Sequence, residues 1–326
     1  MIRETLREDV ELRAGMHVLI TGSGSALVDA ARGGASAAVI IDGHIIQFDC
    51  GRMVMENLVK GGINPLDVDE LVFTHLHFDH IASFGYFIIS NWVASRQEPL
   101  RVIGPAGTAR MARAMVFEGH YADVGFVEGL VRTWPPEVPG RPMDVAPFGV
   151  RDVEPGVVLE TDLFKISAVP VPHFQRFGLL SLGYRVDSRH GSIVISGDCA
   201  PSDALMELAT GADILIHECA KPDPDMVQGG KLTRPTSVEG PLKQHATPHM
   251  TPSWLGSFAT GAKVKTVVAT HLAPLDAVPA SRAMSRVYYG SEPVALDIFE
   301  EYRRRIAANF SGAIHIAHDG LLLSVG

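Results

Sequence analysis

Four side chains that bind metal ions well are concentrated in the short segment Thr74–His80, which reads THLHFDH. His75 and His77 lie two residues apart at the end of the apolar run ELVFT, so in an extended chain both imidazole rings point to the same side. Asp79 and His80 follow where a helix is expected to begin, and the turn of the chain directs them to a neighbouring point. Imidazole nitrogens and carboxylate oxygens are ligands that suit zinc. The spacing therefore predicts two ligands for each of two metal ions.

Further metal ligands are expected at the ends of other strands, and three polar residues occupy such positions. His173 follows the run AVPVP, Asp198 follows IVISG, and His271 follows VVAT. Each alone would be an ordinary polar residue at a strand end, but together they complete two three-ligand sites that share one carboxylate. Two metal ions about 3.5–4 Å apart can hold a hydroxide between them and lower the pKa of water toward about 7. They also stabilise negative charge on substrate oxygens, so we expect hydrolysis at phosphorus, sulfur or a carbonyl carbon.

The elements that position these residues are short apolar runs rich in β-branched residues, separated by turn residues and helical segments. We expect strands at 17–22, 37–42, 44–49, 70–74, 163–169, 180–186, 192–196, 213–217 and 265–270. We expect helices at 55–63, 104–117, 202–211, 251–262 and 295–310, with Ser202 as the N-cap of the third. Strand–helix alternation with antiparallel hairpins predicts an α/β (α+β) fold in which two mixed sheets lie between helices.

The organisation of the chain predicts one domain over residues 1–326, with two halves at about 1–150 and 151–326. Residues 118–150 and 221–248 are rich in proline and glycine and match neither the strand nor the helix pattern. Long irregular segments in compact domains are often lids or binding loops, so we interpret both as loop insertions.

Composition excludes several classes of protein. The net charge is −9 with both signs mixed along the chain, which gives no basic surface for nucleic acid or anionic membranes. No apolar stretch approaches the ~20 residues needed to cross a bilayer, and the N-terminus is charged and lacks an apolar signal core. Cys50, Cys199 and Cys219 are far apart and form no CxxC motif, so we expect a reduced, cytoplasmic protein without membrane contact.

These motifs together resemble the metallo-β-lactamase-fold hydrolases, specifically the branch of ribonuclease Z and the arylsulfatase-like proteins. The resemblance covers nearly the whole chain. It begins with a glycine turn and a hairpin ending in FDCG, continues through THLHFDH, and includes VPHFQRFGLLSLGYRV and SGDCAPSDALMELATGADILIHECA. It ends with HMTP and THLAP. The family implies an αββα sandwich with the metals at the edge of the sheets.

The resemblance also implies how the ligands are shared between two zinc ions, with manganese or iron as alternative metals. One ion is bound by His75, His77 and His173, the other by Asp79, His80 and His271, and Asp198 bridges the two.

Four residues are expected to assist catalysis. Asp79 can orient the nucleophile, and His249 is the candidate for protonating the leaving group or holding the oxyanion, in line with the family. His217 and Glu218 are interpreted as supports that fix ligand orientation. The alternatives are a polar residue at a helix start for His249 and a buried core histidine for His217. His245 lacks the matching spacing.

The substrate is predicted from the departures from the family. The tRNA-processing ribonucleases carry a long glycine- and proline-rich arm between the GYR and SGD strands, whereas here GYRVDSRHGSIVISGD crosses that gap in a few residues. We therefore disfavour the alternative of a tRNA 3′-processing endoribonuclease and do not expect nucleic acid as a partner. The apolar run FGYFIISNW, with Tyr121, Phe126 and Trp134, either walls a pocket for a small apolar group or packs in the core.

The sequence thus predicts a dinuclear zinc-dependent hydrolase of a small ester, most simply a phosphodiesterase or an aryl sulfatase that uses a metal-bridged hydroxide. The alternative is a lactone, carboxylic ester or phosphotriester hydrolase, and β-lactam hydrolysis is disfavoured. A flavin-linked di-iron redox protein would have Glu in place of His77, and a non-catalytic relative would not need the intact ligand set. A homodimer is also expected, although no residue pattern argues for it.

Overall fold

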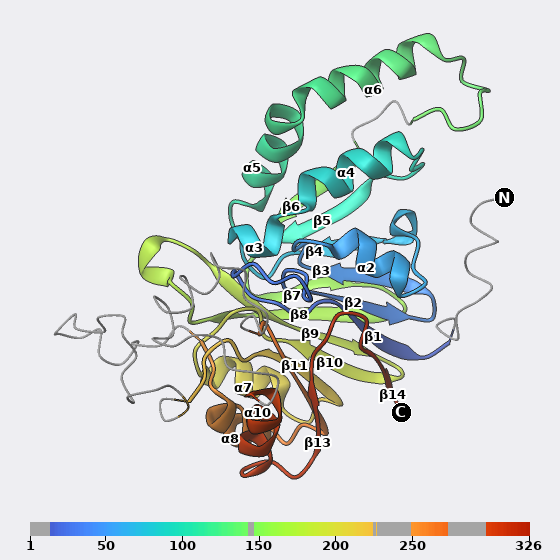
Figure 1. Cartoon of the computed structure of the whole chain (residues 1–326). Coiled ribbons are helices and arrows are strands. Elements are labelled where there is room, and N and C mark those ends of the chain that lie inside the picture. Colours follow the sequence, from blue (N-terminus) through green and yellow to red (C-terminus); the bar gives the residue numbers. More distant parts are fainter. Residues whose placement is uncertain (1–13, 143–146, 224–225, 227–248, 273–297) are drawn as a thin grey trace.

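The computed structural model describes residues 14–142, 147–223, 226, 249–272 and 298–326 and contains two seven-stranded sheets (Figure 1). The first sheet has the order β14-β1-β2-β3-β4-β5-β6. Strands β14 to β3 pair antiparallel, and β3 to β6 pair parallel. Its strands are β1 (Met16–Gly22), β2 (Ser36–Ile41), β3 (His44–Phe48), β4 (Glu70–Val72), β5 (Leu100–Gly104), β6 (Phe148–Asp152) and β14 (Leu322–Val325).

The second sheet has the order β13-β12-β11-β10-β9-β8-β7. Strands β7 to β10 pair antiparallel, and β10 to β13 pair parallel. Its strands are β7 (Gly156–Glu160), β8 (Phe164–Val171), β9 (Ser181–Ser188), β10 (Gly191–Ile195), β11 (Ile214–Glu218), β12 (Thr266–Thr270) and β13 (Ala313–Ile316). Both sheets are mixed, as predicted.

The two sheets pack face to face around a shared apolar core. Ile46 and Val72 of the first sheet belong to the same buried cluster as Ile193 and Ile216 of the second. In β11 the neighbouring Leu215 belongs instead to the cluster under the outer helices. Successive side chains of a strand point to opposite faces, so a strand covered on both faces is apolar throughout. This is why such strands appear in the sequence as continuous apolar runs.

Helices cover the outer face of each sheet, which gives the predicted αββα sandwich (Figure 1). On the first sheet lie α2 (Val54–Lys60), the short turn η2 (Pro65–Asp67), α3 (Phe78–Ile81) and α4 (Phe84–Val93). On the second sheet lie α7 (Asp203–Ala209), α8 (Pro252–Gly261) and α10 (Ile298–Ala307). The predicted N-cap is confirmed, because the Ser202 side chain accepts a hydrogen bond from Leu205 N at 3.2 Å. No helix in these ranges has the length and apolar character required to cross a membrane.

A helical arm projects from the first sheet; its first part falls within the helix predicted at 104–117, and the rest lies where the sequence suggested an irregular loop. It consists of α5 (Thr108–Arg113), the π-helix η3 (Ala114–Gly119) and α6 (Tyr121–Thr133), and Figure 1 shows α6 extending away from both sheets. Helical packing against α4 replaces the expected loop in this part of 118–150.

Among the described residues, the aromatic side chains proposed to wall a pocket differ in their exposure. Tyr121 and Phe126 are exposed on the projecting arm, whereas Phe84 and Phe87 are fully buried in the core beneath α4. The core alternative therefore holds for most of the run FGYFIISNW, whereas Tyr86 within it is 57% exposed. Most of the other expected loop, 221–248, lies outside the described residues, as do His245 and the first residues of the predicted last helix.

Candidate metal centre

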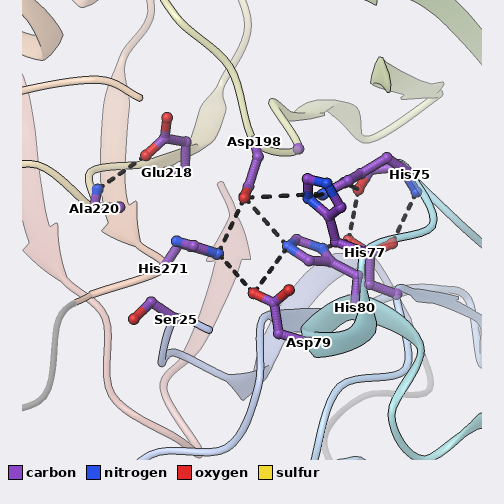
Figure 2. A network of polar contacts seen from close by, with 12 residues as sticks. Ser25, His75, His77, Asp79, His80, Asp198, Glu218, Ala220 and His271 are labelled. Atoms are coloured by element: carbon purple, nitrogen blue, oxygen red, sulfur yellow. Dashed lines mark hydrogen bonds and ion pairs between the residues drawn. The ribbon is translucent and has the colours of Figure 1, made fainter. Parts of the chain in front are cut away.

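The seven predicted metal ligands come together at one edge of the sandwich (Figure 2). They follow β4, β8, β10 and β12, or lie in α3 directly after the β4 loop. Strands of both sheets end at this edge, so short loops bring residues that are far apart in sequence to one point. The seven residues are His75, His77, Asp79, His80, His173, Asp198 and His271.

The first group of ligand atoms joins three imidazole rings to one carboxylate. His75 Nε2 and His173 Nε2 lie 2.9 Å and 3.1 Å from His77 Nδ1. Asp198 Oδ2 lies 3.9 Å from His75 Nε2 and 3.7 Å from His173 Nε2. Three imidazoles and a carboxylate that converge in this way form a donor set suited to zinc.

The second group shares Asp198 with the first. His271 Nε2 lies 3.2 Å from both Asp79 Oδ2 and Asp198 Oδ2, and His80 Nε2 lies 3.3 Å from Asp198 Oδ1. Apart from this ion pair with each other, the buried atoms His80 Nε2 and Asp198 Oδ1 have no hydrogen-bond partner among the described residues. Buried polar atoms usually have partners, so this donor set fits a bound cation. The structure thus contains two His/Asp clusters able to bind metal ions.

Electrostatics within the clusters act differently on the individual histidine and aspartate side chains. Burial lowers the pKa of His75, and the neighbouring His80 lowers it further, so the His75 imidazole is neutral. Burial acts to raise the pKa of Asp198, but His271 and His80 outweigh it and hold that pKa well below its usual range. Burial acts to lower the pKa of His80, but Asp198, Asp49 and other carboxylates raise it well above its usual value. The second cluster therefore attracts positive charge, for which a proton and a metal ion compete.

Asp49 is a supporting residue that the sequence analysis did not single out. It follows β3 and accepts hydrogen bonds from Thr74 N, Thr74 Oγ1 and His80 Nδ1, all at 2.8 Å. The bond to Nδ1 turns the opposite nitrogen of His80 toward Asp198. The only sequence signal for this role was the FDCG end of the first hairpin.

Glu218 and His249 form a pair beside the clusters. Glu218 Oε1 lies 3.2 Å from His249 Nδ1 and accepts hydrogen bonds from Met250 N and Cys199 N at 2.8 Å and 3.3 Å. The His249 ring stacks on His271, with centroids 5.6 Å apart. Burial acts to lower the pKa of His249, but the charge and hydrogen bond of Glu218 raise it to about 9. The structure therefore brings both residues to the site.

His217 occupies a different position. Its Nδ1 donates to the carbonyl oxygen of Glu218 at 2.7 Å, and its ring packs against Phe258 of α8. Among the described residues, none of the seven cluster residues forms a hydrogen bond with it. This placement favours the alternative of a buried core histidine. Cys199 lies 3.6 Å from His217 Nε2 and is itself fully buried.

Aromatic side chains surround the first cluster at the surface. The Phe174 ring lies 4.7 Å from the His173 ring, 5.9 Å from the His77 ring and 6.0 Å from the Phe177 ring, measured between centroids. Phe78 and Phe177 are 67% and 68% exposed. We name Phe174, Phe177 and Phe78, which follows His77 in the chain, the aromatic rim.

Comparisons with known proteins agree with this architecture. The family model of the β-lactamase superfamily domain matches residues 46–272. Ribonuclease Z of Mycobacterium sp. strain KMS is 35% identical over 210 residues, which cover 64% of this chain and 70% of that protein. Ribonuclease Z of Mycobacterium bovis strain BCG / Pasteur 1173P2 is 29% identical over 310 residues, which cover 93% and 96%.

A solved structure with a similar fold is human tRNase Z, short form, with a TM-score of 0.62 at 19% identity over 95% of this chain and 99% of that one. The structure therefore confirms the predicted fold, and the relatives confirm the predicted family. The chain belongs to the metallo-β-lactamase superfamily, in the branch of the ribonuclease Z proteins, and is a metal-dependent hydrolase that acts on ester bonds.

Proposed function

We propose that the protein is a dinuclear zinc hydrolase of a small phosphodiester or aryl sulfate. The observation that carries this proposal is the sharing of Asp198 between two clusters of His and Asp atoms. His75, His77 and His173 would hold one ion, and Asp79, His80 and His271 the other. When bound, such ions activate water and stabilise negative charge on the substrate's oxygens.

We assign the protonation of the leaving group to the pair of Glu218 and His249. Glu218 is fixed by backbone N–H groups and binds His249 Nδ1, which leaves Nε2 of His249 available to a substrate oxygen. Because Glu218 raises the pKa of His249 against the effect of burial, His249 is protonated at neutral pH. A protonated imidazole in this position can donate a proton to the departing oxygen.

The size and chemistry of the substrate follow from the surroundings of the clusters. The aromatic rim supports an ester with an aryl or other planar group, because aromatic rings stack favourably on such groups. Strands β9 and β10 are joined directly at Ser188 and Gly191, so no arm projects between them. The α5–α6 arm carries three arginines balanced by three carboxylates, so it presents no basic surface to a polynucleotide.

A second candidate function is the processing of tRNA 3′ ends. It is favoured by relatives that are named ribonuclease Z and align over almost the whole chain. These relatives weaken our expectation that nucleic acid is not a partner. The cytoplasmic location and the homodimer stay predictions from the sequence.

The experiment is a substrate panel for the zinc-loaded protein. Bis(p-nitrophenyl) phosphate, p-nitrophenyl sulfate, p-nitrophenyl acetate, an aryl phosphotriester and a lactone are compared with a precursor tRNA. We expect the highest kcat/KM for the phosphodiester or the sulfate. Cleavage of the precursor at its 3′ end, at enzyme concentrations too low to turn over the small esters, would establish the second candidate instead.

A further inference from the structure

The second ring nitrogens of the predicted ligand histidines differ in their hydrogen-bond partners. His80 Nδ1 donates to Asp49, and His75 Nδ1 lies 3.1 Å from Thr74 Oγ1. His271 Nδ1, in contrast, is buried and has no hydrogen-bond partner among the residues that the structure describes. Histidines that bind metals almost always donate from the second nitrogen to a carboxylate, a carbonyl or a water molecule. His271 therefore calls for a partner that the described part of the chain does not supply directly.

A cavity that His271 helps to line lies between the two sheets, and His80 and Asp198 of the second cluster also line it. Its volume is about 30 Å³. One water molecule needs roughly 10–15 Å³ measured in this way, together with two or more polar partners. The lining combines apolar side chains of both sheets with polar groups at the strand ends, among them Ile20, Ala37, Ile216, Glu218 and His271. The cavity thus has room for a water molecule and polar groups to hold it.

Glu218 is one of the polar residues that line this cavity. Ligand atoms of Glu218, His249 and His271 lie within 4.8 Å of one another. Figure 2 shows the second nitrogen of His271 turned away from Asp198, on the side of Glu218. Beyond its one backbone bond, from Ala220 N at 2.9 Å, Glu218 Oε2 still has lone pairs to accept with.

We propose that an ordered water molecule binds in this cavity, accepts a hydrogen bond from His271 Nδ1 and donates one to Glu218. This inference rests on the proposed function, since it describes how the proposed acid pair is joined to a proposed metal ligand. The water holds His271 in the Nδ1–H tautomer, so that Nε2 is the nitrogen offered to the metal. Glu218 then orients His249 directly and His271 through the water.

The first test is a crystal structure of the zinc-loaded protein at a resolution at which buried waters are visible. We expect one density peak within hydrogen-bonding distance of His271 Nδ1 and of Glu218. A map that shows other buried waters but none here would overturn the proposal. An anomalous zinc signal at this point would also overturn it, because Glu218, His249 and His271 would then hold a metal.

The second test fills the cavity. Ala37→Val adds two methyl groups to the lining and should exclude the water, whereas Ile20→Val removes one carbon from the same lining and should retain it. Competition with a chromogenic chelator should show one zinc bound roughly 10–100-fold more weakly in Ala37→Val, the usual cost of losing such a partner, and unchanged in Ile20→Val. Unchanged zinc affinity in a folded Ala37→Val protein whose cavity is filled would contradict the proposal.

These outcomes are separable from the proposed function. If the wild-type protein hydrolyses none of the esters, the function fails while the water can still be observed. If it hydrolyses them and the cavity holds no water, only the present inference fails. If Ala37→Val does not fold, as judged by circular dichroism, the wild-type map decides.

Discussion

The carboxylate of Asp49 fixes the orientation of His80 without belonging to either cluster. In Asp49→Asn one oxygen becomes an N–H donor, which cannot accept the hydrogen bonds from Thr74 and His80 together. We expect zinc affinity to fall roughly 10–100-fold, because the ring of His80 loses its anchor. Chelator competition measures this.

The matched control for Asp49 is Asp42→Asn. Asp42 also has a left-handed backbone, with φ of 49° against 55° for Asp49, but it pairs with His190 at a turn away from the clusters. Equal zinc affinities for the two variants would show that Asp49 does not orient a ligand.

His249 gives a prediction about the leaving group. His249→Ala should keep its zinc and its fold, and it should slow turnover by roughly a hundredfold, the usual effect of losing a general acid or an oxyanion donor. The loss should be larger for a phosphodiester with an alkyl leaving group than for a nitrophenyl ester, whose leaving group departs as an anion. Steady-state kinetics on both substrates measure the difference.

The alternatives for His249 give different results in the same experiment. An equal loss on both substrates would indicate oxyanion or substrate binding. Wild-type rates on both would identify His249 as a polar residue at a helix start. In the wild-type protein, turnover of the alkyl ester should decline as pH rises through the pKa of His249, which Glu218 raises to about 9 against the effect of burial.

At the scale of the elements, a buried carboxylate of β4, away from the clusters, forms ion pairs with side chains of the two neighbouring strands, β3 and β5. His44 of β3 lies 2.5 Å from the fully buried Glu70 of β4, which also pairs with Arg101 of β5. Burial acts to lower the pKa of His44, but the hydrogen bond and charge of Glu70 outweigh it and raise the pKa above its usual value.

This pair should make the unfolding free energy depend on pH. The folded pKa of His44 is raised, so its stabilisation is fully present below the unfolded pKa of about 6.5 and is lost as pH rises through the folded value. Urea unfolding of the metal-free protein between about pH 6 and pH 9 should show a smaller loss of stability for His44→Gln than for the wild type. His190→Gln, which leaves the His44–Glu70 pair intact, is the control, and identical pH profiles for wild type and His44→Gln would contradict the assignment.

At the scale of the whole molecule, the stability of the two packed sheets should depend on ions bound by the clusters at their common edge. Bound ions would join ligands from both sheets and bind the folded state only, so chelation should lower the melting temperature. Elemental analysis should find about two metals per chain, as two closed ligand sets require, and His77→Ala should lose metal and activity together. A fully active sample with one metal or none would disprove the dinuclear proposal.

The ligand motif could be predicted from the sequence because its geometry is local. His75 and His77 are two residues apart in extended chain, so their common direction follows from the period of a strand. His173, Asp198 and His271 were identified because each follows an apolar run, and the ends of such runs meet at a sheet edge. Two sheets between helices were predicted from the alternation of strands and helices with antiparallel hairpins, and the family resemblance implied the αββα sandwich.

Other features were decided by the tertiary structure. The helix at Tyr121–Thr133 forms although its sequence appeared irregular, because packing against neighbouring helices stabilises helices more than local propensity does. Asp49 meets His80, and Glu218 meets His249, across 31 residues in each case. Residue spacing in the sequence does not predict such contacts. They depend on how the strands align in the sheets and on the sheet face to which each side chain points. Local periodicity fixes the direction of a side chain within its own element, but only the packing of elements decides which group it meets.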